Sequence, residues 1–418
     1  MSLFDRYCLD IDALDEPNLL KKHRRHAQEA LFSLKIPNYL EPILSHSYER
    51  LSSEEIVSPP LKKYVLEGCE ESYIIFMNGH LRLDLSNIQG LKNAVFLPFT
   101  KALRSYAPLF ESFYSSILQS DKDPLFLLNL ASYQEGAFLY IPPNAHFEKP
   151  LQILSCTKGT NDLWTAPRLH LVLGHHSSLT LLETTAHEGL NKVFHTSSST
   201  FDLADGSSLQ HALLDLSSTK TSSYHGTGVR AFLKKEASFS STSALRGPFH
   251  RDSKKIVLQE EGASTSLQGG WIGAKEDQLH TSIHVEHMKP FCRSKQLFKG
   301  VVAEKSSSSF DGTIKIHEQA NMSEAYELNN NLLLGKEAKA SSYPNLEIYA
   351  EDVKAHHGVT YGKLDKEALF YMKSRGLPSH EAEKLLIGGF MHEILQEIPH
   401  PAMKEKAFDW MHSLPLEE

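Results

Sequence analysis

The sequence is poor in cysteine and in long apolar runs, and each shortage argues against a class of protein. The 418 residues include four cysteines, none in a CxxC pair: Cys8, Cys69, Cys156 and Cys292. This pattern disfavours a disulfide-stabilised secreted protein and a metal site made of cysteine alone. No 18 apolar residues follow one another, and Asp5 and Asp10 interrupt the stretch where a signal peptide would be apolar. We therefore expect a cytoplasmic protein without a membrane segment.

Excess positive charge is also lacking. The 43 Lys and Arg residues face 51 Asp and Glu, a net charge of -8, so binding to nucleic acid or an anionic membrane is not expected. The sequence contains no GxxxxGK[ST] loop, no GxGxxG between a strand and a helix, and no GxSxG elbow. We expect a chain that does not hydrolyse ATP and has no catalytic residues of its own.

The chain divides into three parts by the pattern of its apolar residues. Residues 1–135 are predicted to form a mostly helical domain with a small β element, a hairpin around Asn78-Gly79. Residues 136–362 consist of short alternating apolar runs broken by Gly, Ser, Ala and Asp, which predicts strands. From residue 363 to 418 helical periodicity returns, with Asp365 and Ser379 as expected N-caps.

The central part has a loose repeat. Small residues mark similar turns at intervals of 30, 30, 26, 43 and 32 residues: Ser177, Ser207, Ala237, Ala263, Ser306 and Ala338. Short units that cannot bury a face alone predict a stacked parallel β-helix, although a sandwich with long hairpins would give a similar pattern. We expect the C-terminal helices to close the solenoid, because its last coil would otherwise expose an open edge.

Histidine is abundant, with 23 copies. On a strand, His280, His284 and Glu286 in "HTSIHVEHM" would share one face and could hold a divalent metal, although a histidine-rich chain produces such spacing readily. This triad leaves open a cupin-like His-metal enzyme. The solenoid by itself would also permit a β-helix enzyme acting on polysaccharide.

A second histidine motif is "KAHHGVTYG" at residues 354–362. Adjacent residues on a strand point to opposite faces, so only one of His356 and His357 can face a shared site. From these residues alone, each is more simply a turn residue bonded to a carbonyl or to water.

The sequence around this motif changes this interpretation. The segments "NNNLLLG", "PNLEIYAEDVKAHHGVTYGKLD", "LFYMKSRGL" and "LLIGGF", between residues 329 and 390, resemble the SufD branch of the SufB/SufD family, the scaffold subunits of the SUF iron–sulfur cluster assembly system. The resemblance implies a mainly β fold, a right-handed parallel β-helix between N-terminal and C-terminal helical domains.

The resemblance also implies site residues. The family's "C-S-H-G" motif reads Ala355-His356-His357-Gly358 here, so its functional histidine corresponds to His357, a candidate iron ligand, and Ala355 replaces its cysteine. His356, Glu351 and Asp352 are secondary candidates. Residues 328–331 lack the cysteine of SufB's "QCDS" segment, which favours the SufD branch. Because a ligating imidazole must be neutral, we expect assembly to weaken at acidic pH.

The partners and cofactors implied are those of a shared scaffold. Such a chain pairs with SufB through the β-helix, or with itself when alone, and binds the ATPase SufC through its C-terminal helices. The expected SufC contacts are Lys373, Arg375 and a turn at Gly388-Gly389-Phe390, whereas most of Phe370, Tyr371, Leu385, Leu386 and Phe390 are expected in the core. A transient Fe–S cluster or iron would be shared with SufB, and none would be tightly bound to the isolated chain.

Overall fold

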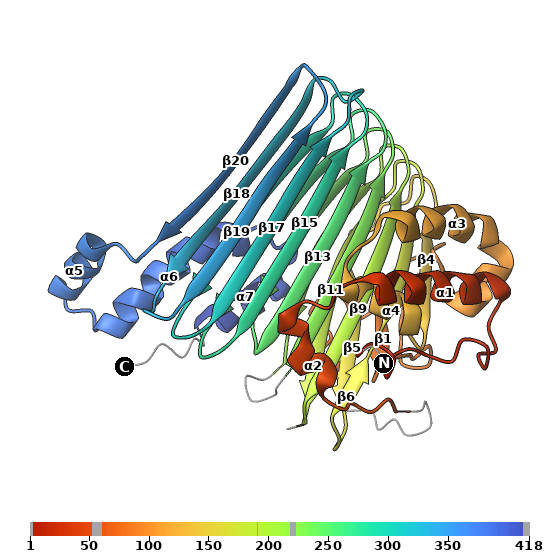
Figure 1. Cartoon of the computed structure of the whole chain (residues 1–418), viewed down its shortest axis with the longest axis horizontal. Helices are drawn as coiled ribbons and strands as arrows, with labels where there is room; N and C mark the ends of the chain where they lie inside the picture. The colour runs from red at the N-terminus through yellow and green to blue at the C-terminus, as the bar shows by residue number, and fades with distance from the viewer. Residues whose placement is uncertain (1–2, 52–60, 190, 218–222, 413–418) are drawn as a thin grey trace.

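The computed structural model describes residues 3–51, 61–189, 191–217 and 223–412, and its centre is a parallel β-solenoid. Among the described residues, two ten-stranded sheets, here called sheet I and sheet II, face each other along its length (Figure 1). The chain alternates between them, so successive strands of one sheet pair in parallel across one coil. The predicted fold class, mainly β with helices at both ends of the chain, is confirmed.

The strands have the following bounds. Sheet I consists of β1 (Tyr73–Met77), β2 (His80–Leu81), β5 (Leu151–Lys158), β8 (Ser178–Glu188), β10 (Ser208–Asp215), β12 (Ser238–Leu245), β14 (Ser264–Gly273), β16 (Arg293–Val302), β18 (Ser323–Leu333) and β20 (Val353–Gly362). Sheet II consists of β3 (Val95–Pro98), β4 (Gly136–Ile141), β6 (Leu163–Thr165), β7 (Arg168–Leu173), β9 (Val193–Leu203), β11 (Ser223–Leu233), β13 (Phe249–Leu258), β15 (Gln278–His287), β17 (Ser307–Ile316) and β19 (Lys339–Ile348).

The repeat is real, but its predicted alignment mixed two kinds of corner. Ser177, Ser207, Ala237 and Ala263 precede strands of sheet I, whereas Ser306 and Ala338 precede strands of sheet II. The 43-residue interval is therefore wrong as a coil length, because Ser264 pairs with Arg293 in the next coil. Both corners use the same local bond, since Ser207 Oγ donates to the Ala204 carbonyl and Ser306 Oγ to that of Ala303. Local sequence does not distinguish such corners.

The N-terminal helices cover the outer face of sheet II (Figure 1). They are α1 (Asn18–Ser33), α2 (Glu41–Ser45), α3 (Phe99–Ser120) and α4 (Pro124–Ser132), with a 3-10 turn at Asn38–Leu40. A second 3-10 turn, Leu61–Lys63, packs instead on sheet I, where Leu61 lies against the cluster that includes Ile75 and Leu154. Phe126 and Leu128 of α4 are buried in one cluster with Phe194, Phe232 and Val257 of the sheet. The hairpin at Asn78-Gly79 is confirmed: both residues have positive φ and join β1 to β2.

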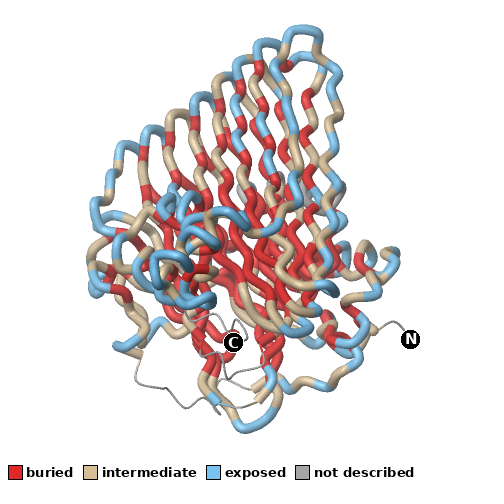
Figure 2. The backbone as a smooth tube through the Cα atoms, turned by 90° about the vertical axis from the view of Figure 1, so that its left-hand side faces the viewer, coloured by how far each residue is buried: buried red, intermediate tan, exposed pale blue. Residues whose placement is uncertain are grey.

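The C-terminal helices do not close the solenoid, so that expectation is wrong. The helices α5 (Lys366–Ser374), α6 (Ser379–Leu395) and α7 (Pro401–His412) follow β20. Ile387 and Met391 of α6 and Trp410 of α7 pack on the outer face of sheet I, in one buried cluster with Ile272 and Val301. The helices α6 and α7 pack on the apolar outer face of β10 to β16. The edge strands β19 and β20 carry no buried residue (Figure 2).

The helix starts are only partly as predicted. The Asp365 carboxylate accepts hydrogen bonds from the amides of Glu367 and Ala368, which confirms it as the N-cap of α5. The expected cap at Ser379 is wrong, because Pro378 occupies the N-cap position of α6 and no side chain caps it. Among the described residues, no helix combines the length and apolar character needed to cross a membrane.

Candidate functional site

The structure of the last coil of the solenoid shows which of the two adjacent histidines faces inward. On β20, Ala355 belongs to an interior cluster, so His357, two residues further, lies on the inward side. His356 lies on the outward side, where its ring stacks on Tyr326 with centroids 5.5 Å apart. Both histidines are exposed, because β20 is the outermost strand of sheet I. His357 is thus an imidazole at an open end of the molecule.

Glu327 of β18 is the neighbour of His357 on the inward side. The two residues pair in register, so their Cα atoms are roughly 4.8 Å apart. Only 1% of Glu327 is exposed, and neither carboxylate oxygen has a hydrogen-bond partner among the described residues. Its carboxyl extends to Gly312 of β17, where a Cβ would collide with it. Burial, and secondarily the charge of Asp311, raises the pKa of Glu327 to about 7.

A polar layer continues from Glu327 along β18. The side-chain Oδ1 of Asn329 accepts hydrogen bonds from Asn331 Nδ2 at 2.7 Å and from Ser342 Oγ at 2.6 Å. Both asparagines are buried, whereas the preceding coils have Phe298 and Phe310 in the interior. The interior therefore changes from apolar to polar toward the open end.

The secondary candidates Glu351 and Asp352 lie in the turn that leads into β20, and both are exposed. This turn is held by backbone bonds, since the Met322 amide donates to the Asp352 carbonyl at 2.6 Å. The structure places both carboxylates near the start of β20, about five residues before His357, which is roughly 16 Å along a strand.

No thiolate is available at this end from the described residues. Cys69, Cys156 and Cys292 are buried and Cys8 is half-buried. Burial raises the pKa of Cys69 and Cys156 to about 12 and that of Cys8 and Cys292 to about 11. These thiols stay protonated at neutral pH, and a protonated thiol is neither a ligand nor a nucleophile.

The predicted triad on β15 is not brought together. His280 is buried against Tyr39, with ring centroids 3.9 Å apart, and its Nδ1 lies 2.7 Å from Ser309 Oγ. Glu286 instead meets His284 at 3.0 Å and His317 at 3.3 Å. The hydrogen bond from His284 and the charge of Lys255 lower the pKa of Glu286 against the opposing effect of burial. His284 and Glu286 form a partly exposed hydrogen-bonded pair that does not include His280.

The candidate SufC contacts in the C-terminal helices include exposed residues and residues packed toward sheet I. Lys373 and Arg375 at the end of α5 are exposed. Gly388, Gly389 and Phe390 lie within α6, so the predicted turn is wrong. Phe390 is half-buried, and its carbonyl accepts a hydrogen bond from Lys299 Nζ at 2.9 Å. It helps to fasten α6 to sheet I.

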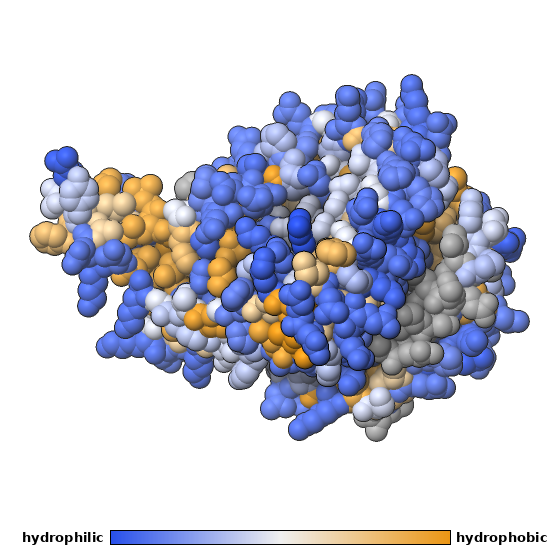
Figure 3. Space-filling model, turned by 90° about the horizontal axis from the view of Figure 1, so that it is seen from above, coloured by the Kyte–Doolittle hydropathy of each residue, from blue (hydrophilic) through white to orange (hydrophobic). Residues whose placement is uncertain are grey.

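The expectation that most of the large apolar residues here are core is also wrong. Phe370 is 75%, Tyr371 60% and Leu385 51% exposed, and α5 buries no residue at all. Seen from above, apolar side chains cover the projecting left-hand end of the molecule, where α5 lies (Figure 3). We call Phe370, Tyr371 and Leu385 the α5–α6 patch.

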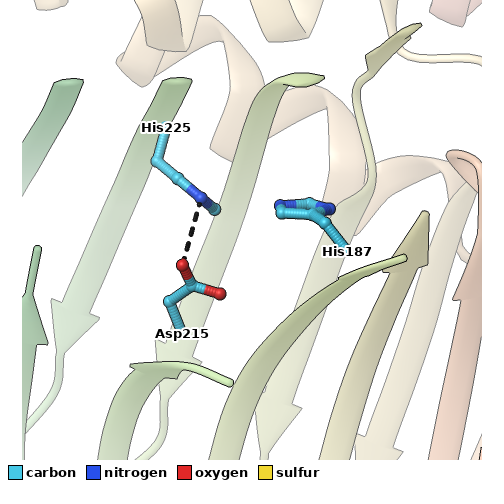
Figure 4. A group of neighbouring side chains, drawn as sticks. All are labelled: His187, Asp215 and His225. Atoms are coloured by element: carbon cyan, nitrogen blue, oxygen red, sulfur yellow. Dashed lines mark ion pairs between the residues drawn. The ribbon is translucent and has the colours of Figure 1, made fainter. Parts of the chain in front are cut away.

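A second group of functional side chains lies inside the solenoid. His187 of β8, Asp215 of β10 and His225 of β11 have ligand atoms within 4.8 Å of one another, and among the described residues this is the one such group of three (Figure 4). His195 and His250 flank His225 in register on sheet II. Burial lowers the pKa of His187 and His250 to about 3 and lowers those of His195 and His225.

Comparison with known proteins decides the family. The model "SUF system FeS cluster assembly, SufBD core domain" matches residues 156–390, more than half of the chain, and "SufBD protein N-terminal region" matches residues 64–153. The chain belongs to the SufBD family. The predicted resemblance is confirmed, and the family is one of iron–sulfur cluster assembly.

Individual SufBD relatives agree with the SufD branch. The chain is 31% identical to "Iron-sulfur cluster assembly protein SufD" of Escherichia coli over 262 residues, which cover 62% of each chain. It is 26% identical to SufD of Bacillus subtilis over 426 residues, 94% of this chain and 93% of the relative. A SufBD family protein of Synechocystis is 24% identical over 92% of this chain and 88% of its own.

Sequence reasoning about this SufBD chain missed Glu327 and the interior histidines. A signal for the histidines was present: His195 and His225 are 30 residues apart, which is the repeat interval, so they occupy equivalent positions in successive coils. Glu327 had no such signal, because its burial depends on the coil above it.

Proposed function

We propose that this SufBD family chain is a non-catalytic scaffold subunit for iron–sulfur cluster assembly in the cytoplasm, which pairs with SufB and binds the ATPase SufC. The observation that carries the proposal is His357, an inward-side imidazole exposed on the outermost strand of the solenoid. A ligand in this position is open to groups from another molecule. ATP hydrolysis belongs to SufC in this proposal.

The open coil supports pairing with a second β-helix. The outer edges of β19 and β20 pair with no strand among the described residues, so they present free backbone donors and acceptors. Exposed apolar side chains surround them, with Tyr343 66%, Leu328 49% and Tyr361 49% exposed. SufB, the SufD-like chain's paralogue, would cover this surface, and a second copy would do so in its absence.

The chemistry of the coil supports a shared ligand set. Iron in nascent clusters favours thiolates, and imidazole replaces thiolate on iron in Rieske centres. The four thiols of this chain are removed from the last coil or protonated. The thiolate must then come from SufB, with His357 as this chain's contribution to the iron or transient cluster.

The direct test compares the two adjacent histidines. His357→Ala is expected to abolish cluster assembly on the complex reconstituted with SufB and SufC, while the three subunits still co-purify. His356→Ala is the matched control, because it removes a neighbouring exposed imidazole from the opposite face, and it should assemble clusters as the unaltered chain does. Cluster formation is followed by its visible absorption. Equal assembly by His357→Ala in an intact complex would refute the role of His357.

The α5–α6 patch supports docking of SufC. Three large apolar side chains exposed together on a projecting helix pair are typical of an interaction site. Deleting residues 363–418 would also uncover Ile272 and Val301 of sheet I, so a point substitution is the cleaner experiment.

Tyr371→Asp should therefore greatly weaken capture of SufC in a pull-down, because it places a charge in the apolar contact. Phe32→Asp is the control, since Phe32 is a 44% exposed apolar residue on α1, outside the patch. Unchanged capture by Tyr371→Asp, or equal loss in both variants, would count against this docking surface.

A further inference from the structure

The interior histidine group is separate from the last coil. Asp215 lies on β10, and β12, β14, β16 and β18 separate this strand from β20 in sheet I. Five strand spacings amount to roughly 24 Å. The cluster therefore has no part in the ligand set proposed around His357, and it needs its own explanation.

The imidazoles of His187, His195 and His225 are buried, and each has a ring nitrogen without a hydrogen-bond partner among the described residues. His187, His195 and His225 are each at most 3% exposed. Neither ring nitrogen of His187 has a hydrogen-bond partner among the described residues, and the same holds for Nε2 of His195 and of His225. The ring centroids of His187 and His225 are 5.1 Å apart. Buried polar atoms in native proteins are satisfied as a rule, so this concentration of unpartnered ring nitrogens points to an atom that they bind.

Asp215 supplies the carboxylate of this group, and hydrogen bonds from the protein fix its orientation. Its Oδ1 accepts hydrogen bonds from Thr185 Oγ1 at 2.8 Å, the Ser217 amide at 2.9 Å and Ser217 Oγ at 2.6 Å. Its Oδ2 faces His225 Nε2 at 3.5 Å (Figure 4). One oxygen is thus fixed by the protein while the other points into the histidine group, which is the arrangement of a carboxylate ligand with its supporting bonds.

The distances suit one small ion. Ligands bonded at about 2.0–2.2 Å around a tetrahedral ion lie roughly 3.3–3.6 Å from one another. Asp215 and His225 already have this separation, at 3.5 Å, and all three ligand atoms lie within 4.8 Å. The ring of His195 lies beside this group, with its centroid 5.8 Å from that of His187, and its Nε2 has no hydrogen-bond partner among the described residues. Arg246 also lies within electrostatic reach of Asp215, and its guanidinium donates to the Ser217 carbonyl at 3.1 Å.

We propose that His187, Asp215 and His225 form a binding site for one divalent transition-metal ion of the Zn²⁺ or Fe²⁺ class. Two imidazoles and one carboxylate are the donors that such ions take in proteins. The ion fastens β8, β10 and β11 to one another across the interior, and so joins the two sheets at this corner.

The test uses the full chain alone, freed of metal with a chelator and titrated with Co²⁺. We expect one equivalent to remain after gel filtration, with the visible absorption of a four- or five-coordinate ion, and Zn²⁺ to displace it. His187→Gln and His225→Gln should lose this absorption. His356→Ala removes an exposed imidazole on the outward side of the last coil, so it is the matched control and should bind Co²⁺ as the unaltered chain does.

A second variant keeps the proposal falsifiable if a ligand variant does not fold. Thr185→Val preserves volume but removes one hydrogen bond to Asp215, and it should weaken Co²⁺ binding about 10- to 100-fold. Far-UV circular dichroism establishes folding for each variant. Absence of a retained equivalent in the unaltered chain, equal loss of binding in His356→Ala, or unchanged affinity in Thr185→Val would each overturn the proposal.

Discussion

Replacing Asp252 by alanine is expected to lower the free energy of unfolding by about 3–5 kcal/mol, because it leaves a buried lysine without its counter-charge. Asp252 and Lys254 of β13 pair inside the solenoid, and both side chains are 0% exposed. Asp252 also accepts hydrogen bonds from Ser243 Oγ at 2.9 Å and Thr227 Oγ1 at 3.1 Å. Burial would raise the pKa of Asp252, but the Lys254 charge and hydrogen bond bring it below its ordinary value.

The check is urea unfolding at pH 7 of the single variant and of the double variant Asp252→Leu/Lys254→Met. The double variant should recover most of the lost stability, since replacing both charges with apolar groups of similar volume removes the uncompensated charge. A loss below about 1 kcal/mol in Asp252→Ala would contradict the pairing seen in the interior.

Glu327→Gln should make the isolated chain more stable at pH 8 by up to about 3 kcal/mol, with little effect at pH 4. The pKa of Glu327 is raised from 4.5 to about 7 in the folded state. Its folded state therefore favours the protonated form, and the stability present below pH 4.5 is lost as the pH rises through about 7. At about 1.4 kcal/mol for each pKa unit, the full loss is about 3 kcal/mol. A glutamine at this position stays neutral at every pH and so avoids this loss of stability.

The measurement is the urea midpoint and slope for both proteins at several pH values between 4 and 8. Glu324→Gln is the control on the same strand, because Glu324 points outward and pairs with Lys354 at 2.9 Å on the surface. A stability difference for Glu327→Gln that is the same at pH 4 and pH 8 would show that Glu327 is not protonated by burial.

Patterns that depend on neighbours in the sequence predicted much of this molecule. The Asn78-Gly79 hairpin follows from two residues that accept positive φ, and the Asp365 cap from one short carboxylate before a helix. The opposite orientation of His356 and His357 follows from the two-residue period of a strand. Each of these is a local consequence of backbone geometry.

Contacts between distant segments were less predictable. His280 and His284 share a strand face, but Tyr39 covers only the first, so the predicted triad does not assemble. Phe370 and Leu385 are large apolar residues of the kind found in a core, but both are exposed, because α5 packs on no sheet. His187, Asp215 and His225 come from three strands and converge only when the coils stack.

The sequence by itself determined the repeating β fold, the opposite orientation of His356 and His357 and the SufBD family, because the same local pattern recurs in every coil. Only the tertiary structure decided where the helices pack, that the last coil stays open, and that Glu327 and the interior histidines are buried. Those features depend on which apolar face offers the larger contact and on what the adjacent coil covers, and neither is encoded within one repeat.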